Sequence, residues 1–213
     1  MKQTTYDILK DLSLRYPALE AIEDSITSAA ELIAETYYSS GKLLLCGNGG
    51  SASDSLHIVG ELMKEFAIKR PLPEEVKSAL KDAGDDGYMA DNLQRALPAV
   101  SLVGVTALES AYANDAAPDL GFAQQVLGLG VSGDTLLGIT TSGNSKNVIY
   151  AVRAAKAKGL KTVILTGCGG GKIKDICDCA VIAPANETYK IQEYHLPIYH
   201  TLCLALENEF FGE

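Results

Sequence analysis

Residues 43–61 join a short apolar run to an amphipathic run through a cluster of small residues. The apolar letters LLLC come first, GNGGS follows, and Leu56, Val59 and Leu62 then recur at helical spacing. This order predicts a buried strand, a tight turn and a helix. Glycines in such a turn tolerate positive φ and let the free N–H groups at the helix start approach an anion. The stretch therefore predicts one unit of an α/β fold with a ligand-binding loop.

Short apolar runs alternate with helical patterns along the rest of the chain. The predicted strands are residues 43–46, 99–105, 134–139, 161–166 and 179–183. Strands that alternate with helices predict a parallel sheet covered on both faces, with ligand loops at the carboxyl ends of the strands. A length of 213 residues with 47% hydrophobic residues suits one core, so we expect residues 1–213 to form a single domain.

Two segments lie outside this alternation. Residues 1–40 carry two helical patterns, which we expect to pack on the sheet or on a neighbouring subunit. Residues 71–98 are polar, charged and helix-prone, and they predict an inserted helical hairpin. The hairpin is either a lid over the site or a solvated excursion without a role. Farther on, Asn114 and Asp115 predict a turn, which precedes a helix over residues 122–129.

The predicted strand 134–139 runs directly into a second polar loop, residues 140–145, with the letters TTSGNS. Capping the helix that follows needs a single hydroxyl. This loop carries the hydroxyls of Thr140, Thr141, Ser142 and Ser145. Because hydroxyl and backbone donors at a helix N-terminus form an anion site, the loop predicts a phosphate site. It should share one pocket with the GNGGS loop, since both follow strands of the same sheet.

The histidines are confined to two helical segments. His57 and Glu61 are four residues apart, so they should project from one helix face, about 10 Å beyond the first loop. An ordinary solvated helix face is the alternative interpretation of this pair. The last helical pattern of the chain, residues 189–211, carries the other two histidines, His195 and His200. His195 is either a second proton donor or a histidine outside the site.

Bulk composition disfavours several classes of function. The formal net charge of −9 argues against a nucleic-acid partner, whose phosphates are bound by many cationic side chains at once. The sequence shows no apolar signal core and no run of membrane-spanning length, so we expect a cytoplasmic protein without a membrane partner. The odd number of cysteines, five, indicates reduced thiols. Cys168, Cys177 and Cys179 lack the paired spacing of a zinc–thiolate site.

Taken together, the motifs of this chain resemble those of the sugar isomerase (SIS) domain family and, within it, of the phosphoheptose isomerases. The resemblance rests on CGNGGSASDSLHIVGEL, the AND letters of residues 113–115, GITTSGNSKNVI, LTGCGGGKI and KIQEYHLPIYH. These motifs cover nearly the whole chain in this order. Their joint occurrence is much more specific than any one of them.

The resemblance implies an aldose–ketose isomerase that interconverts sedoheptulose 7-phosphate and D-glycero-D-manno-heptose 7-phosphate. It implies one zinc ion per site, and the ligands would be His57, Glu61, Gln192 and His200. Glu61 would remove the substrate proton, with His200 as the partner acid/base. The phosphate would bind Thr140, Thr141, Ser142 and Ser145. The sugar would meet Asn48, Gly49, Gly50, Ser51, Asp115 and Gln192. The family forms homotetramers with active sites between subunits.

This chemistry suits the residue types. A carboxylate and an imidazole carry the protons of an aldose–ketose exchange, and a divalent ion polarises the carbonyl group. The chain also departs from the family, because residues 71–98 are longer than the usual connection. In addition, Lys64 and Glu65 stand where relatives commonly carry Gly and Arg, and an acidic residue near the pocket would repel a phosphate.

The spacing of the implied zinc ligands raises a geometric question. Gln192 and His200 are eight residues apart, a rise of about 12 Å on a continuous helix. Pro197 lies between them and should bend the helix or begin a new first turn. Either the helix is irregular there, or a neighbouring subunit completes the ligand set.

Two other functions fit the resemblance. One is a non-catalytic SIS module that binds a protein partner, like the replication-initiator-associating protein of bacteria. The other is a regulator that senses a sugar phosphate, for which the sequence shows no DNA-binding pattern. The full set of His57, Glu61, Gln192 and His200 favours the enzyme.

Overall fold

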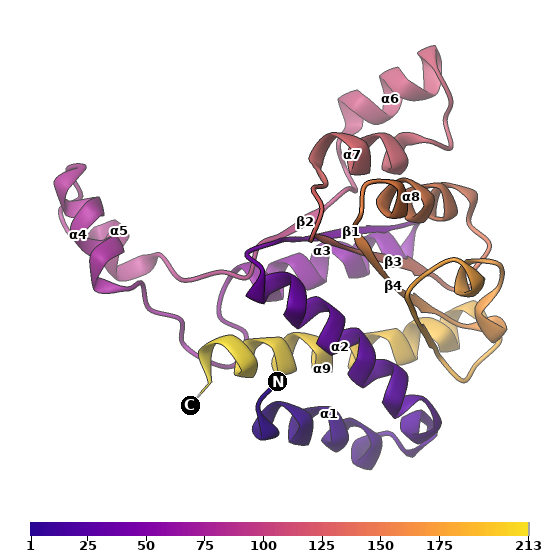
Figure 1. Cartoon of the computed structure of the whole chain (residues 1–213), viewed down its shortest axis with the longest axis horizontal. Coiled ribbons are helices and arrows are strands. Elements are labelled where there is room, and N and C mark those ends of the chain that lie inside the picture. Colours follow the sequence, from indigo (N-terminus) through magenta and orange to yellow (C-terminus); the bar gives the residue numbers. More distant parts are fainter. Residues whose placement is uncertain (213) are drawn as a thin grey trace.

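The computed structural model describes residues 1–212 and contains a five-stranded parallel sheet with the strand order β2-β1-β3-β4-β5 (Figure 1). The strands are β1 (Leu43–Gly47), β2 (Ala99–Ser101), β3 (Thr135–Thr140), β4 (Lys161–Thr166) and β5 (Cys179–Ile182). β1 and β3 are neighbours, and Gly47 pairs with Ile139. The loops that follow these two strands therefore leave the same edge of the sheet side by side. The predicted parallel α/β sheet is confirmed.

Helices cover both faces of the sheet (Figure 1). One layer contains α1 (Gln3–Arg15), η1 (Pro17–Ile22), α2 (Glu23–Tyr38), α3 (Gly50–Met63) and α9 (Thr188–Phe211). The other contains α7 (Gly121–Leu129) and α8 (Lys146–Ala157). Short turns η2 (Cys168–Gly170) and η3 (Ile173–Asp175) link β4 to β5. Since every residue of β1 and β3 is buried, the central strands read as continuous apolar runs, as buried parallel strands do.

Three local predictions were wrong. The strand expected over 99–105 ends at Ser101, and Gly104 adopts a φ of +86° that breaks the extended run. Asn114 and Asp115 do not form a turn, because they complete the helix α6 (Thr106–Asp115). α9 continues through Pro197 without a new first turn. The backbone carbonyl that Pro197 leaves without a donor belongs to Glu193, which is exposed, so water can bond it.

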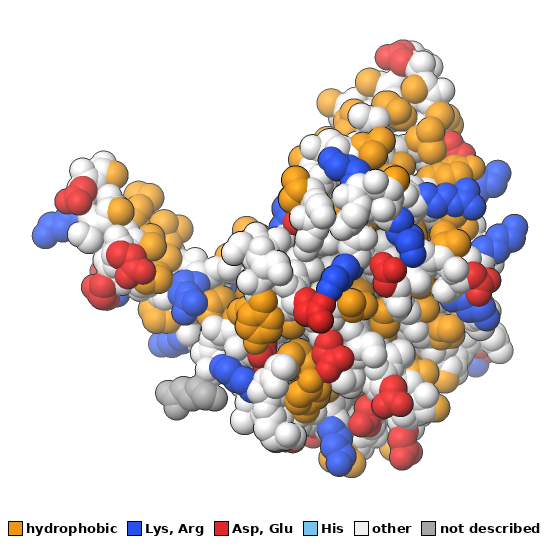
Figure 2. Space-filling model, viewed as in Figure 1, with side chains coloured by type: hydrophobic (Ala, Val, Ile, Leu, Met, Phe, Trp, Pro, Cys, Tyr) orange, Lys and Arg blue, Asp and Glu red, His pale blue; other side chains and the backbone are white. Residues whose placement is uncertain are grey.

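The insertion at residues 71–98 forms a helical hairpin, as predicted. Its helices α4 (Glu74–Asp82) and α5 (Tyr88–Asn92) contain no buried residue and pack on each other. An antiparallel bridge between Pro71 and Gln94 closes its base. The hairpin stands away from the sheet, and hydrophobic side chains line part of its surface (Figures 1 and 2). We call it the arm, and it does not cover the loops of its own chain.

No helix within the described part of the chain combines the length and apolar character needed to cross a lipid bilayer.

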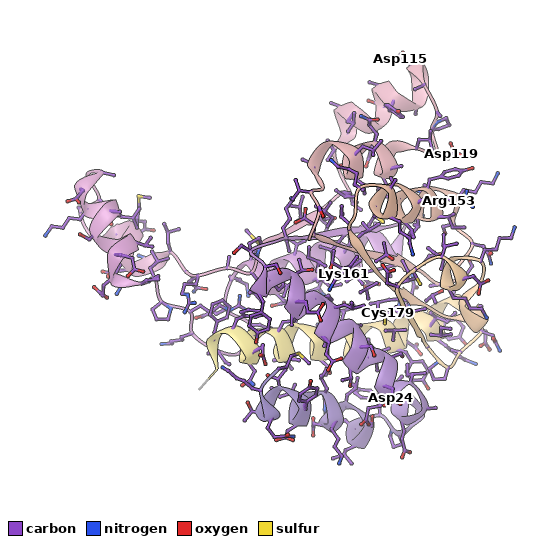
Figure 3. The ribbon with its side chains drawn as sticks, in the orientation of Figure 1. Asp24, Asp115, Asp119, Arg153, Lys161 and Cys179 are labelled. Carbon is purple, nitrogen blue, oxygen red and sulfur yellow. The ribbon has the colours of Figure 1, made fainter. Side chains whose placement is uncertain are left out.

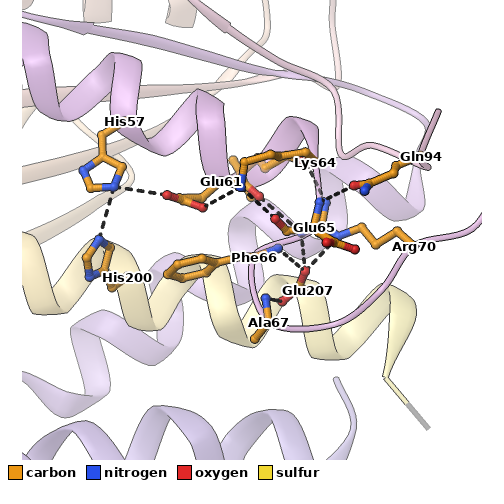
Figure 4. A network of polar contacts seen from close by, with 11 residues as sticks. His57, Glu61, Lys64, Glu65, Phe66, Ala67, Arg70, Gln94, His200 and Glu207 are labelled. Carbon is orange, nitrogen blue, oxygen red and sulfur yellow. Dashed lines mark hydrogen bonds and ion pairs between the residues drawn. The ribbon is translucent and has the colours of Figure 1, made fainter. Parts of the chain in front are cut away.

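A buried ion pair fixes the turn between α3 and the arm. The side chains of Arg70 and Glu207 are both 0% exposed, and they meet at 2.8 Å. Glu207 also accepts the backbone N–H groups of Phe66 and Ala67, each at 2.8 Å. Arg70 in turn donates to the last carbonyl groups of α3, including that of Glu61 at 3.2 Å (Figure 4). The pair therefore ties the end of α3 to α9.

We expect Glu207→Ala to lower the free energy of unfolding by about 3–5 kcal/mol, because it leaves the buried Arg70 charge unpaired. Urea denaturation measures the loss. Glu74→Ala is the matched control, since it breaks an ion pair whose carboxylate is 86% exposed and should cost less than about 1 kcal/mol. Equal losses of unfolding free energy in the two variants would contradict a stabilising role for the buried pair of Arg70 and Glu207.

Candidate active site

Two loops at the carboxyl edge of the sheet are joined by a pair of amides. Asn48 of the first loop donates to the side-chain oxygen of Asn147 at 2.9 Å, and Asn147 donates back at 2.8 Å. The predicted placement of the GNGGS and TTSGNS loops at one edge of the sheet is confirmed, whereas their sharing of one pocket stays a prediction. Sequence reasoning missed Asn147, because a polar residue at the start of a helix carries no signal of a partner 99 positions away.

The second loop presents its hydroxyls at the N-terminus of α8. Thr140 is buried, and its hydroxyl lies 2.9 Å from that of Ser145. Ser145 occupies the N-cap position of α8 but makes no capping bond with its side chain. Ser142 is exposed, and Thr141 is partly exposed. The hydroxyls of this loop are thus not consumed by capping, and the helix dipole favours an anion beside them.

A second glycine cluster, residues 167–171, packs against the backbone of this loop at Ser142 and Gly143. Gly143 has a φ of +64°, and a Cβ atom there would lie 2.1 Å from the carbonyl oxygen of Gly170. A Cβ atom on Gly171 would lie 2.4 Å from the carbonyl oxygen of Ser142. Ile173 donates its N–H to the carbonyl of Gly143 at 3.1 Å. The close approach of these two backbones holds the loop in one shape.

A cavity of about 400 Å³ opens beside the first loop, toward α6 and α7. Its lining includes Asn48, Asn147, Ala52, Glu109 and Tyr112. The lining also shows that the cavity lies on the opposite side of α3 from the histidines, because Ala52 points away from the face that carries His57. Asp115 does not reach it, since it lies at the outer end of α6 (Figure 3). Within one chain, Asp115 is not brought to the other predicted sugar-binding residues.

α3 and α9 lie side by side and run in the same direction. At the loop end, the amide nitrogen of Gln192 would be 2.4 Å from a Cβ atom on Gly50, so Gln192 packs directly on the first loop. Two turns farther on, the rings of His57 and His200 meet edge to face with centroids 5.0 Å apart. The same face of α3 therefore contacts α9 at both places, through Gly50 and through His57.

His57, Glu61 and His200 lie together (Figure 4); the spacing predicted only that His57 and Glu61 share a helix face, and His200 was expected from the family resemblance. Nε2 of His57 lies 3.1 Å from Oε1 of Glu61 and 3.5 Å from Nε2 of His200. The hydroxyl of Tyr199, which sequence reasoning missed, lies 3.0 Å from Nδ1 of His57. The ring of Phe66 covers His200 at a centroid distance of 5.5 Å. Two imidazoles and a carboxylate thus converge in a half-exposed crevice.

The surroundings of this cluster set its charge state. Burial, followed by the neighbouring His57, lowers the pKa of His200, while Glu61 opposes the shift. The shift favours the neutral form of the His200 ring. Oε2 of Glu61 is buried without a hydrogen-bond partner. The ammonium of Lys64 lies 3.6 Å from this oxygen, so Lys64 places a positive charge beside the Glu61 carboxylate.

The imidazole nitrogens and carboxylate oxygens of this cluster are donor atoms that zinc accepts. Two of the distances between them also suit a zinc ion. Ligand atoms about 2.0–2.1 Å from a tetrahedral zinc lie roughly 3.4 Å apart, close to both distances measured from Nε2 of His57. The orphaned Oε2 of Glu61 is a further oxygen donor. Within residues 1–212, however, no three His, Cys, Asp or Glu side chains already surround one point. Binding an ion therefore requires a side chain to rotate.

Gln192 and His195 lie apart from this cluster. α9 is continuous, so an interruption at Pro197, one of the two alternatives for the ligand spacing, is not found. Gln192 lies at the first loop of its own chain. His195 is fully buried, and its Nε2 lies 3.2 Å from the carbonyl oxygen of Thr166. Burial lowers the pKa of His195. His195 is thus a buried residue that packs between α9 and β4.

We expect Gly143→Ala to lower the free energy of unfolding by about 2–5 kcal/mol, through strained φ and a backbone clash. Gly169→Ala is the matched control. Its φ is +73° and a Cβ atom there meets nothing within 4 Å, so only the conformational penalty of roughly 1–2 kcal/mol remains. Urea denaturation of both variants measures the difference. If the two substitutions cost the same, the contact with Gly170 does not support the loop.

Comparisons with known proteins agree with this architecture. The SIS domain family model matches residues 13–95 and 90–167. The phosphoheptose isomerase of Nitratiruptor sp. is 39% identical over 90% of this chain and 89% of its own length. That of Helicobacter pylori (strain Shi470) is 39% identical over 91% and 88%. A solved phosphoheptose isomerase from Neisseria gonorrhoeae superposes with a TM-score of 0.72 at 34% identity, covering 90% of this chain and 91% of that one. The chain therefore belongs to the SIS domain family and, within it, to the phosphoheptose isomerases.

Proposed function

We propose that this protein is an aldose–ketose isomerase that interconverts sedoheptulose 7-phosphate and D-glycero-D-manno-heptose 7-phosphate. Its relatives are named phosphoheptose isomerases. The observation that carries the proposal is the convergence of His57, Glu61 and His200 two helical turns from an anion-binding loop edge. Such a site can bind the phosphate of a sugar phosphate at the loop and act on its carbonyl group at the cluster.

The phosphate binds the second loop in this proposal. Its donors are the hydroxyls and backbone N–H groups of Thr141, Ser142 and Ser145, together with the dipole of α8. From Gly50 to His57 the rise along α3 is about 10 Å. An extended, open-chain sugar phosphate spans this distance, with Asn48, Ser51 and Gln192 beside its middle carbons. The site therefore favours a long sugar chain over a short one.

The carboxylate of Glu61 moves the proton between carbons. It removes a proton from C1 of the ketose and returns it to C2, and an enediol forms between the two steps. Oε2, which accepts no hydrogen bond and lies 3.6 Å from the Lys64 ammonium, takes the proton in this proposal, while Oε1 faces His57. The neutral ring of His200 donates its N–H to the carbonyl oxygen and passes a proton between O2 and O1.

A zinc ion, when bound, polarises the carbonyl group and stabilises the negative charge that develops on its oxygen. We propose His57, Glu61 and His200 as its ligands from one chain. Gln192 of a neighbouring subunit would be the fourth ligand, since the Gln192 of the same chain packs on Gly50. Two oxygens let Glu61 hold the ion with one and take the proton with the other.

We further propose a homotetramer with sites between subunits, working in the cytoplasm. The side chain of His57 is 42% exposed, so the crevice lacks a cover within one chain. Leu56 and Met63 of the same helix expose apolar surface that a second subunit could bury. The five free thiols suit a reducing compartment.

Replacing Glu61 by Gln should reduce kcat/KM for sedoheptulose 7-phosphate by about 10²–10⁴, because it removes the base. The assay is product analysis with zinc present, on ketose phosphates of different chain lengths. Glu65→Gln makes the same chemical change one turn farther along, outside the cluster, and should retain activity. A wild-type protein without aldose product, indistinguishable from Glu61→Gln, would instead favour the non-catalytic SIS module.

Ser142→Ala should weaken substrate binding by about 1–3 kcal/mol, because the phosphate loses a hydrogen-bond donor to a charged group. Titration of the Glu61→Gln background with the sugar phosphate measures affinity without turnover. Ser28→Ala serves as the control, since its hydroxyl bonds only a carbonyl of its own helix. Unchanged affinity in Ser142→Ala removes this residue from the phosphate site.

A further inference from the structure

The arm carries apolar side chains that the described part of its own chain leaves exposed. They are Val76 of α4, Tyr88 and Met89 of α5, and Leu93, and the Tyr88 side chain is 74% exposed. Figure 2 shows hydrophobic side chains gathered on one side of the arm. Its helices, of nine and five residues, are too short to be stable in water by themselves. Since exposed apolar patches mark interaction sites, we expect another molecule to cover the arm.

The root of the arm, residues 67–71 and 94–98, is fixed to the rest of the chain. Arg95 donates its backbone N–H to the carbonyl of Arg70 at 2.9 Å, and its guanidinium lies over the ring of Phe211 at 4.7 Å. Arg70 itself is held in the buried ion pair. The arm therefore projects in a fixed direction, and its apolar side chains cannot be buried by folding back on their own chain.

Charge is divided between the two ends of the arm. The turn at its tip, residues 81–87, contains three aspartates and a single lysine. The root contains Lys69, Arg70 and Arg95 and no acidic residue. Arg70 is neutralised by Glu207. Lys69 and Arg95 are exposed, and within the described part of the chain neither forms an ion pair. The tip is therefore acidic, and the root is basic.

We propose that the arms of two copies of this chain pair across a two-fold axis, apolar side against apolar side, with each acidic tip on the basic root of the other copy. A two-fold axis makes the two tip-to-root contacts identical, so opposite charges meet at both ends of the pair. Helices this short cannot bury the roughly 1,200–2,000 Å² of a stable interface. The arms therefore add to the subunit contact proposed at α3, and the insertion gains a role beyond the proposed reaction.

Zero-length cross-linking of lysines to carboxylates in the full-length protein tests the pairing directly. On a denaturing gel, a covalent dimer should appear. Mass spectrometry of this dimer should find Lys69 joined to Asp82, Asp85 or Asp86, and the same linked peptide should be absent from the monomer band. Lys69→Arg keeps the positive charge but removes the reacting amine, so it should abolish this linked peptide.

Charge reversal gives a second test, in which analytical ultracentrifugation measures the dissociation constant of the assembly. Asp82→Lys with Asp86→Lys, or Lys69→Glu with Arg95→Glu, should raise this constant about tenfold or more, because like charges then meet. All four substitutions in one chain should return the constant to within about threefold of the wild type, because the reversed charges attract again.

Asp7→Lys with Glu20→Lys is the control, since it makes the same change of net charge on α1 and η1 and should leave the constant unchanged. A linked peptide confined to the monomer, or a fourfold variant that dissociates as readily as either pair of substitutions, would overturn the inference. A monomeric wild type would overturn both the pairing and the proposed homotetramer. A protein that assembles without the linked peptide loses the pairing alone, whereas an inactive protein with linked arms loses only the proposed reaction.

Discussion

The alignment of α3 with α9 is the constraint on which the site depends. At one end Gln192 rests on Gly50, and at the other Glu207 holds the turn that follows α3. Between these anchors the two helices cannot slide past each other, because the carbonyl groups at the end of α3 are bound by Arg70. His57 and His200 meet as a result of this register. The reactive groups are therefore placed by backbone contacts at both ends of the crevice.

The sheet supplies the other half of the arrangement. Parallel neighbours β1 and β3 end together, so each delivers its polar loop to one edge, and Asn48 bonds Asn147 at the start of the helix that follows the second loop. Backbone amides, hydroxyls and a helix dipole gather there. A chain with a net charge of −9 can thus still hold an anion, because these donors act over short distances.

Much of this could be predicted from the sequence, and the failures have a common cause. The strands, the two loops and the pairing of His57 with Glu61 follow from periodicity along one segment. Asn147 and Tyr199 were missed because their partners lie 99 and 142 positions away, and no local pattern encodes such a contact. Asp115 was placed in the site by resemblance alone, whereas within one chain the helix that carries it points outward.

The new first turn, one of the two outcomes expected at Pro197, is absent for a different reason. A proline inside a helix lacks the backbone N–H that would bond the carbonyl four residues earlier. Whether the helix continues depends on whether that carbonyl can bond water instead. Here that carbonyl belongs to an exposed residue, Glu193. The helix therefore carries the proline without interruption, and the eight-residue separation of Gln192 and His200 is preserved along its length.

The bridge between Pro71 and Gln94 affects how the sequence and length of the arm can change in evolution. Because the two ends of the insertion meet at one point, the chain enters and leaves it with almost no net displacement. Arg70 precedes the bridge, so lengthening, shortening or rewriting the hairpin leaves the buried ion pair where it is. The catalytic body and its appendage are thus free to change at different rates, and new recognition could be acquired without disturbing the chemistry.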